Sequence, residues 1–211
     1  MADWATISSM ATAGGTLVLA LATFSSVRSA NRAARLAELS LLAGLRPVLI
    51  PSKEDDPVER ISFGDGYVLS VPGHGGTLEL ANDNVYMAIA LRNGGSGLAV
   101  IHGWHPDIHK PVLDMKAPAL DEFRRQQRDL YIPAGHTGFW QGALRDSSED
   151  VHGRLAAAAG SSEIVAVDLL YGDHEGGQRT IARFRISFAG EAEQPRAEVV
   201  RYWNVDGEDP R

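Results

Sequence analysis

A run of 24 residues without a charged side chain, from Trp4 to Val27, is the feature that most constrains this chain. A helix of that length rises roughly 36 Å, which is enough to cross a hydrocarbon core of about 30 Å. Its most apolar part is TLVLALATF, residues 16–24. We therefore predict a single transmembrane helix that uses the lipid bilayer as its partner through residues 4–27.

Two other interpretations of this run are a cleaved signal peptide and a soluble amphipathic helix. A signal peptide carries basic residues before its apolar core, whereas here only Met-Ala-Asp precedes the core and the arginines follow it. A soluble amphipathic helix carries charge along one face, and this run has none. The pattern favours the transmembrane interpretation.

The charges beside the run predict its direction. Arg28, Arg32 and Arg35 follow it, and no basic residue precedes it. Cytoplasmic flanks of membrane helices are enriched in Lys and Arg. We therefore expect a protein of the inner (cytoplasmic) membrane with its N-terminus outside and residues 28–211 in the cytoplasm. Export of the domain is the alternative topology.

The helix is predicted to continue beyond the membrane, because no breaker occurs before Gly44 and Pro47. We expect one helix over residues 4–43, or two with a bend. Small residues at four-residue spacing in its first half also suit close helix pairing, so a homo-oligomer is one possible assembly. The predicted organisation is a transmembrane segment (1–27), a juxtamembrane helix (28–45), a β-sandwich domain (46–206) and a tail (207–211).

After Pro47 the pattern changes to the alternation that is typical of antiparallel sheets. Val85, Met87, Ile89 and Leu91 share one face of a predicted strand. Other predicted faces are Leu98, Val100, His102 and Trp104; Val165, Val167, Leu169 and Tyr171; and Thr180, Ala182, Phe184, Ile186 and Phe188, with Arg183, Arg185 and Ser187 opposite. Shorter strands are predicted at 47–51, 60–63, 66–71, 77–80, 129–132 and 137–144, and a last strand at 197–204.

Many short strands separated by glycine-rich turns indicate a sandwich or a barrel. We predict a mainly β fold, an antiparallel immunoglobulin-like sandwich, with a β-barrel as the alternative. The turns at 92–97 (RNGGSG) and 172–178 (GDHEGGQ) join strong strands, and the glycines of the first are expected to supply positive φ angles. Short helices are predicted at 118–128 and 147–159 from their capping residues and charge order.

Charge and cysteine content exclude several functions. The whole chain has a net charge of −7. Residues 1–45 have three arginines against Asp3 and Glu38, a net charge of +1, so residues 46–211 carry −8. Nucleic-acid binding depends on a basic surface, so we expect no nucleic-acid partner. The absence of cysteine excludes disulfides, thiolate metal sites and cysteine nucleophiles.

Two stretches are candidate binding surfaces. Asp173, His174, Glu175 and Arg179 crowd one loop, and binding residues often lie on loops held by a rigid sheet; a solvated polar turn explains the same residues. Residues 128–146 combine aromatic residues with arginines, among them Trp140 and Arg145. That combination suits an interface or the core of a sandwich.

Motifs for catalysis and cofactors are not found. His102, His105 and His109 have helical spacing but lie on a predicted strand, where the first two point to opposite faces. The glycine-rich segments fail the nucleotide-loop patterns, and GGSG fails the serine-nucleophile pattern. We therefore predict no metal, no cofactor and no catalytic residue.

Three segments carry a resemblance to a known group: LRNGGSGLAVIHGWH, FRRQQRDLYIPAGHTGFWQGALRD and DLLYGDHEGGQRTIARF. Together they resemble uncharacterised actinobacterial proteins that have an N-terminal membrane segment followed by "RP" and a β-rich domain. The likeness covers most of residues 4–190. It implies this architecture and no activity.

The sequence therefore predicts a non-enzymatic, single-pass membrane protein that presents a cytoplasmic β-sandwich for protein interaction or self-association. One alternative is a sensor that binds a small molecule or nucleotide and passes the event to the membrane helix. A second alternative is a hydrolase that uses Asp173, His174 and Glu175.

Overall fold

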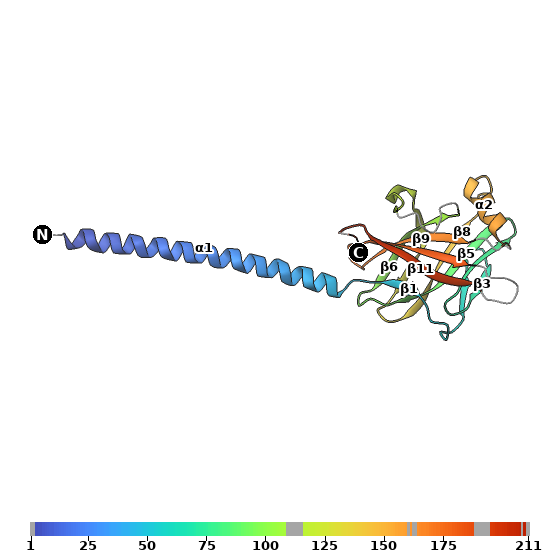
Figure 1. Ribbon diagram of the computed structural model, residues 1–211, viewed down its shortest axis with the longest axis horizontal. Coiled ribbons are helices and arrows are strands. Elements are labelled where there is room, and N and C mark those ends of the chain that lie inside the picture. Colours follow the sequence, from blue (N-terminus) through green and yellow to red (C-terminus); the bar gives the residue numbers. More distant parts are fainter. Residues whose placement is uncertain are drawn as a thin grey trace. The chain divides into compact units, whose positions relative to one another are not determined.

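The computed structural model describes residues 3–108, 116–159, 161, 164–187, 195–207 and 209. The chain divides into two units, residues 1–44 and residues 45–211. Figure 1 shows the first as a single helix and the second as a body of strands. The boundary lies one residue before the expected start of the β domain at residue 46.

Helix α1 runs without interruption from Trp4 to Gly44, as one of the two predicted forms requires. Its segment Ser8–Glu38 contains an 18-residue stretch with a mean hydropathy of 1.5 and is long and apolar enough to cross a membrane. Within it, Thr12 and Thr16 donate hydrogen bonds to the carbonyl oxygens four residues earlier, at 2.9 and 2.8 Å. Backbone carbonyls therefore satisfy these hydroxyls inside the helix, as an apolar surrounding demands.

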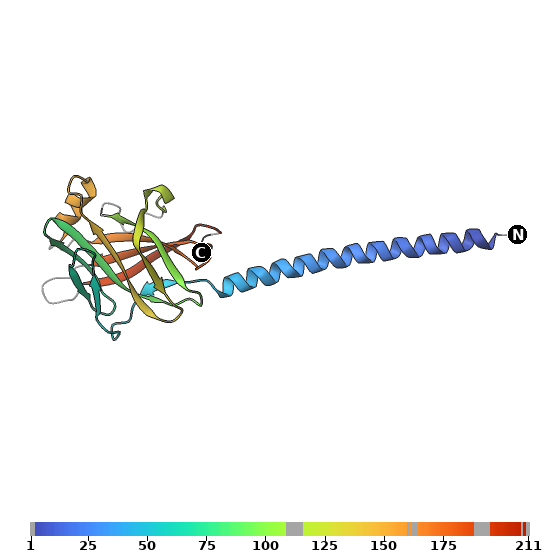
Figure 2. The same ribbon diagram turned by 180° about the vertical axis from the view of Figure 1, so that it is seen from behind.

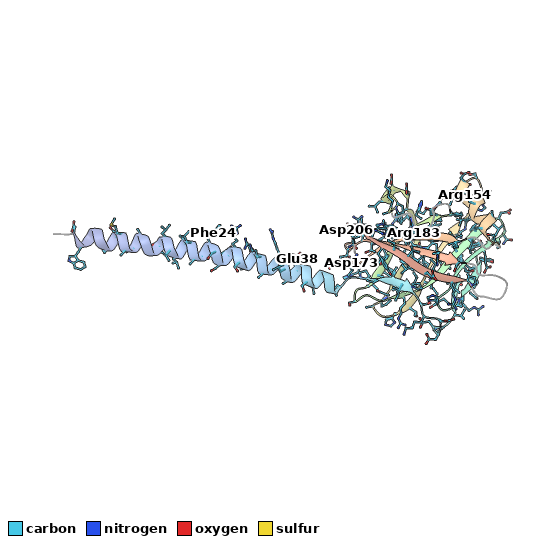
Figure 3. The ribbon with its side chains drawn as sticks, viewed as in Figure 1. Phe24, Glu38, Arg154, Asp173, Arg183 and Asp206 are labelled. Carbon is cyan, nitrogen blue, oxygen red and sulfur yellow. The ribbon has the colours of Figure 1, made fainter. Side chains whose placement is uncertain are left out.

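Polar and apolar side chains extend from α1 in different places along its length. The side chains of Arg28, Arg32 and Arg35 are exposed, like the other described side chains of the helix. Figure 3 labels Phe24 within the apolar part and Glu38 at the end of the apolar segment.

The second unit is mainly β, and its named strands pair antiparallel, which confirms the predicted fold class. The strands are β1 (Leu49–Pro51), β2 (Glu59–Ser62), β3 (Val68–Val71), β4 (Gly76–Ala81), β5 (Asn84–Asn93), β6 (Ala99–Asp107), β7 (Arg124–Ile132), β8 (Thr137–Leu144), β9 (Val165–Gly172), β10 (Thr180–Ser187) and β11 (Arg196–Asn204). Helix α2 (Asp150–Ala158) confirms the helix predicted over 147–159.

The strands form two large sheets and one small one. In the four-stranded sheet, β5 pairs with β8 on one side and with β4 and β1 on the other. The five-stranded sheet has the order β11-β10-β9-β6-β7, and β2 pairs with β3 alone. The chain crosses between the large sheets after β5, after β7 and after β8.

The large sheets enclose one hydrophobic core, and Figures 1 and 2 show the strands of these sheets from opposite sides. Val85, Met87, Ile89 and Leu91 of β5 all face it, as predicted, and so do the predicted faces of β9 and β10 in their described part. Phe188 lies outside the described residues. Trp104 and Trp140 meet edge to face in this core with ring centroids 5.5 Å apart. Burial of these aligned apolar faces is the main force that holds the sheets together.

At one edge of the sandwich, backbone and side-chain contacts join the two large sheets. Gly75, just before β4, forms an isolated bridge with Arg196 at the start of β11. The Ala197 N–H also donates to the His74 carbonyl oxygen at 2.9 Å. Further along, the Tyr202 hydroxyl donates to the Leu49 carbonyl oxygen at 2.8 Å. The domain is therefore a sandwich with one partly closed side, and its strand order leaves the immunoglobulin-like connectivity unconfirmed.

The β2–β3 hairpin forms a third layer over the four-stranded sheet. Ile61, Leu69 and Val71 pack on the residues of β5 that face away from the main core. Tyr86, Ala88 and Ala90 are consequently buried as well, so β5 has no polar face. Strand β5 is therefore covered on one face by the main core and on the other by the hairpin.

Two predicted elements are wrong in type or facing. Residues 118–128 are not a helix: only Leu120–Glu122 forms a short 3-10 turn, and β7 begins at Arg124. Pairing with β6 overrides the weak helical signals there, and Gln126, Leu130 and Ile132 alternate as buried residues.

The facing of β6 also differs from the prediction. The register shifts between Ile101 and Gly103, which is the mark of a β-bulge. Because a bulge resets the alternation, Ala99, Ile101 and Trp104 face the core, whereas Val100 and His102 are only partly buried. The single face predicted through Leu98, Val100, His102 and Trp104 is therefore wrong.

The glycines of residues 92–97 have a different role from the one expected. Positive φ angles occur at Gly66, Gly135 and Gly176 and not in this turn. A Cβ on Gly97 would lie 1.7 Å from the Leu45 carbonyl oxygen. Gly97 is needed because the backbone at the start of the domain passes directly against it.

Candidate ligand-binding cavity

Strands β7 and β8 follow each other in the chain but belong to different sheets, and a cavity of about 660 Å³ opens between them. The loop after β2 completes its wall. The lining residues are Ser62, Phe63, Gly64, Asp65, Trp104, Arg124, Arg125, Gln126, Gln127, Arg128, Gln141, Gly142, Ala143 and Arg145. The volume is in the range of small-molecule sites.

The edges of two strands form the walls of this cavity. Five consecutive residues of β7, 124–128, line it, although alternate side chains of a strand point to opposite faces. The backbone of β7 therefore borders the cavity too. At this seam the Gln126 Nε2 donates to the Gln141 carbonyl oxygen at 3.1 Å, so a side chain bridges the two strands.

Two buried amide groups lie in the wall. Gln126 and Gln141 are each only 9% exposed. Their Oε1 atoms accept no hydrogen bond from the residues that the structure describes. Buried polar atoms in folded proteins are almost always hydrogen-bonded, so these two oxygens, which are closed to the cavity, are exceptions inside its wall.

The lining is basic although the chain as a whole is acidic. It contains four arginines against the one carboxylate of Asp65. Arg145 binds Asp65 at 2.9 Å, and Arg124 forms an ion pair with Glu149 while its guanidinium lies over the Trp104 ring. These two arginines are therefore neutralised within the domain.

The other two arginines of the lining have no carboxylate partner among the described residues. Arg128 lies over the Phe139 ring, with 5.8 Å between its Cζ and the ring centroid. No ion pair is formed by Arg125 within the same part of the chain. A cavity with two such guanidinium groups attracts anions.

Asp65 is held at the cavity wall by several donors. The Tyr86 hydroxyl donates to it at 2.7 Å, and this bond together with Arg145 lowers the pKa of Asp65. Burial, followed by the bond to Asp65, raises the pKa of Tyr86. Tyr67 stacks on Tyr86 and donates to Glu79, which raises the pKa of Tyr67 to about 12. The carboxylate therefore stays ionised and holds Arg145 in place.

Gly142 lines the cavity and lies against two indole rings of the core. A Cβ on this residue would lie 2.6 Å from Cζ2 of Trp140 and 3.1 Å from Cε2 of Trp104. Both rings are rigid and packed in the core, so neither can move aside easily. Only glycine lets the pair of indoles pack this close to β8.

The loop predicted as a binding surface is held by hydrogen bonds between its own residues. The Asp173 carboxylate accepts hydrogen bonds from the backbone N–H groups of Glu175 and Gly177, at 3.0 and 2.8 Å, and from the Gln178 side chain at 3.3 Å. Asp173 is buried, whereas His174 and Glu175 are exposed. Its carboxylate thus holds the turn in the manner of an Asx turn.

Arg179 is also engaged. Its guanidinium binds the Asp206 carboxylate, with the shortest distance at 2.6 Å. This ion pair raises the pKa of Arg179 and lowers the pKa of Asp206. Figure 3 shows Asp173 and Asp206 near the same end of the domain. Asp173 and Arg179 are therefore each bound to partners within the domain.

The other two predicted surface residues have separate positions. Trp140 is fully buried in the core, so it is not part of an exposed surface. Arg145 lines the cavity. The remaining cavity residues come from 62–65, 104, 124–128 and 141–143. Those of 124–128 were missed because a helix was predicted at 118–128. The alternation in RRQQRDLYI was the signal that could have located them on a strand.

Of the three histidines with helical spacing, His102 and His105 are described, and neither lines the cavity. His102 is partly buried near Arg179, and burial lowers its pKa. His105 Nδ1 lies 3.2 Å from the Glu122 carbonyl oxygen, and His109 is outside the described residues. In the part of the chain that the structure describes, no group of His, Asp and Glu is arranged to hold a metal ion.

A buried ion pair lies on the outer side of the five-stranded sheet. Arg183 of β10 binds Asp168 of β9 through two hydrogen bonds, both 2.7 Å long. Burial raises the pKa of Asp168, and the guanidinium opposes this. The Arg183 Cζ also lies 5.1 Å from the centroid of the Trp203 ring, and Figure 3 labels Arg183 among the strands. Its geometry is that of a structural pair.

Comparison of the chain with protein families, curated proteins and solved structures gives no match.

Proposed function

We propose that this chain is a single-pass membrane protein whose β domain binds a small anionic ligand without transforming it. The observation that supports this best is the cavity between β7 and β8, where Arg125 and Arg128 have no carboxylate partner among the described residues. Of the functions predicted from the sequence, the cavity favours the small-molecule sensor over presentation of a surface to a protein partner.

The proposal includes the direction of the membrane helix. The N-terminus lies outside the inner membrane and the β domain lies in the cytoplasm. Support comes from Arg28, Arg32 and Arg35, which all follow the apolar segment of α1. Ligand binding in the cytoplasm would then be reported at the membrane through the anchor.

Cysteine labelling tests the direction, because the chain has no cysteine of its own. His174 is exposed on the β9–β10 loop, so a His174→Cys variant carries one reactive thiol. A membrane-impermeant maleimide should leave this thiol unlabelled in intact cells and label it after lysis. Equal labelling before and after lysis would show that the domain is exported.

Thermal denaturation of the full-length chain in lipid nanodiscs tests ligand binding. Inorganic phosphate, compared with chloride at equal ionic strength, should raise the melting temperature, because a ligand that binds only the folded state stabilises it. Arg128→Gln should reduce this shift. Arg154→Gln removes the same charge from the exposed side of α2, labelled in Figure 3, and should leave the shift unchanged. Equal shifts for both variants would contradict the proposal.

A further inference from the structure

We infer that α1 carries a binding site for an anionic phospholipid, formed by Arg28, Arg32 and Arg35 where the charge-free run ends. The site takes the phosphodiester head group of a lipid such as phosphatidylglycerol, and the acyl chains of that lipid run back along the apolar part of the helix. The inference uses the membrane helix of the proposed function and goes beyond it, because it does not depend on the cavity of the β domain.

The three arginines lie on one face of α1. An α-helix turns by about 100° per residue, so positions 28, 32 and 35 fall within about 60° of one another around the helix axis. They line a shallow groove on the side of the helix, and its other lining residues are Phe24, Val27 and Asn31.

The opposite face of the same stretch carries no charge. Residues 26, 29, 30, 33 and 37 lie on that face, and all of them are serine or alanine. The rule that basic residues mark the cytoplasmic flank counts charges and makes no demand on their face. Placing all three arginines on one side is therefore a feature that the direction of the helix does not require.

The guanidinium groups on this face are available to a ligand. All three arginine side chains are exposed, and none of them forms an ion pair with a residue that the structure describes. Glu38, labelled in Figure 3, is the only acidic residue of α1 and forms no ion pair within the described residues either. Guanidinium groups bind phosphate oxygens through paired hydrogen bonds, so this face complements an anionic head group.

The position of the arginines selects a lipid over a free phosphate ester. Each Cα–Cβ bond of an α-helix tilts toward the N-terminus, so these side chains lean back toward the end of the charge-free run. Long cationic side chains at the end of a membrane helix reach the head-group layer in this way. Phe24 and Val27 are exposed in the same groove and offer an apolar surface to an acyl chain, which a free phosphate ester lacks.

Native mass spectrometry of the full-length chain in detergent tests the inference. The chain is offered equal amounts of phosphatidylglycerol and phosphatidylcholine with the same acyl chains. Phosphatidylglycerol should be retained at least about tenfold more, because each basic residue near the surface favours an anionic lipid. An excess of glycerol 3-phosphate should not displace it. Displacement would show that the site takes a free phosphate ester and would overturn the inference.

Two sets of variants separate a site from general attraction between charges. Arg28→Gln, Arg32→Gln and Arg35→Gln combined should bring the ratio of the two lipids to about 1. The second variant keeps the net charge but moves two arginines to the opposite face, through Arg32→Ala with Ala33→Arg and Arg35→Ala with Ala37→Arg. It should lose most of the preference as well. An undiminished preference in this second variant would show that charge alone attracts the lipid, and the inference would be wrong.

The outcomes are separate from those of the proposed function. Arg154→Gln, which removes a charge from α2, should leave the lipid ratio unchanged. Equal retention of the two lipids by the unaltered chain would contradict the inference and leave the phosphate-dependent thermal shift of the β domain as it stands. Retention of neither lipid would contradict both the inference and the membrane anchor. If the lipid preference is found but phosphate gives no thermal shift, the inference holds and the proposed ligand binding is wrong.

Discussion

Two regions of the β domain concentrate charged and polar residues, and they use them in opposite ways. In the β9–β10 loop, Asp173 accepts three hydrogen bonds from its own loop and Arg179 is paired with Asp206. In the cavity between β7 and β8, two arginines and two glutamine oxygens are left without such partners among the described residues.

The difference follows from where the residues come from. Side chains a few positions apart in a tight turn reach each other's backbone, so a polar cluster in sequence tends to satisfy itself. The cavity residues come from 62–65, 104, 124–128, 141–143 and 145, and no local rule pairs them. Charges that remain available for a ligand are therefore better sought where distant segments meet.

The largest loss of stability is expected from Arg183→Met, which breaks a buried ion pair formed within the domain. Removing the guanidinium leaves Asp168 buried without its partner, which should lower the free energy of unfolding by about 3–5 kcal/mol. Denaturant unfolding measures this loss. Adding Asp168→Leu should restore most of it, because the buried charge is then gone. A single-variant loss below about 1 kcal/mol would contradict the structural role of the pair.

The second largest loss of stability is expected at Gly142 in the lining of the cavity. Gly142→Ala should lower the free energy of unfolding by about 1–3 kcal/mol, because its methyl group meets two packed indole rings. Gly153→Ala in α2 is the matched control, since a Cβ there meets no atom within 4 Å. That control should raise stability by about 0.5–1 kcal/mol, as expected for glycine inside a helix. Similar losses of stability for the two variants would show that the packing around Gly142 is not tight.

Asp173→Ala should have a smaller effect, a loss of about 1–2 kcal/mol, because the turn loses the carboxylate that accepts its N–H groups. His174→Ala, one position away and exposed, should change stability by less than about 0.5 kcal/mol. Thermal unfolding of both variants gives the comparison. A neutral Asp173→Ala would return this loop to the set of candidate binding surfaces.

The smallest effect is expected where charges are unpaired. Arg125→Gln combined with Arg128→Gln should change the free energy of unfolding by no more than about 0.5 kcal/mol without ligand, since no ion pair with a described residue is lost. The same denaturant titration measures it. A loss above about 1.5 kcal/mol would show that these arginines support the fold, and the contrast between the two regions would disappear.

Much of the fold could be predicted because large apolar residues at every second position are a strong local signal for a strand. The alternate residues of 85–91 and of 165–171 show this pattern, and they face the main core. The β-bulge at His102 could not be foreseen, because it depends on the register between β6 and its two neighbours. The burial of Tyr86 could not be foreseen either, because the residues that bury it come from the separate β2–β3 hairpin.

The cavity could be predicted only in small part. Arg145 was named from the sequence for its place among aromatic residues, and it lines the wall. Arg125, Gln126 and Arg128 were assigned to a helix, since acidic residues before basic ones suit a helix dipole as well as they suit a turn and a strand. The pairing that decides between these lies with β6, which is distant in sequence.

The hydrogen bond from Tyr202 to Leu49 has a consequence for the order of synthesis. Its partners are 153 residues apart, one just after α1 and the other on the last strand. The bridge between Gly75 and Arg196 has the same character. On the ribosome the helix emerges first, but β1 and the start of β4 must wait for β11 before these contacts can form. Helix α1 is therefore synthesised long before the domain that follows it can finish folding.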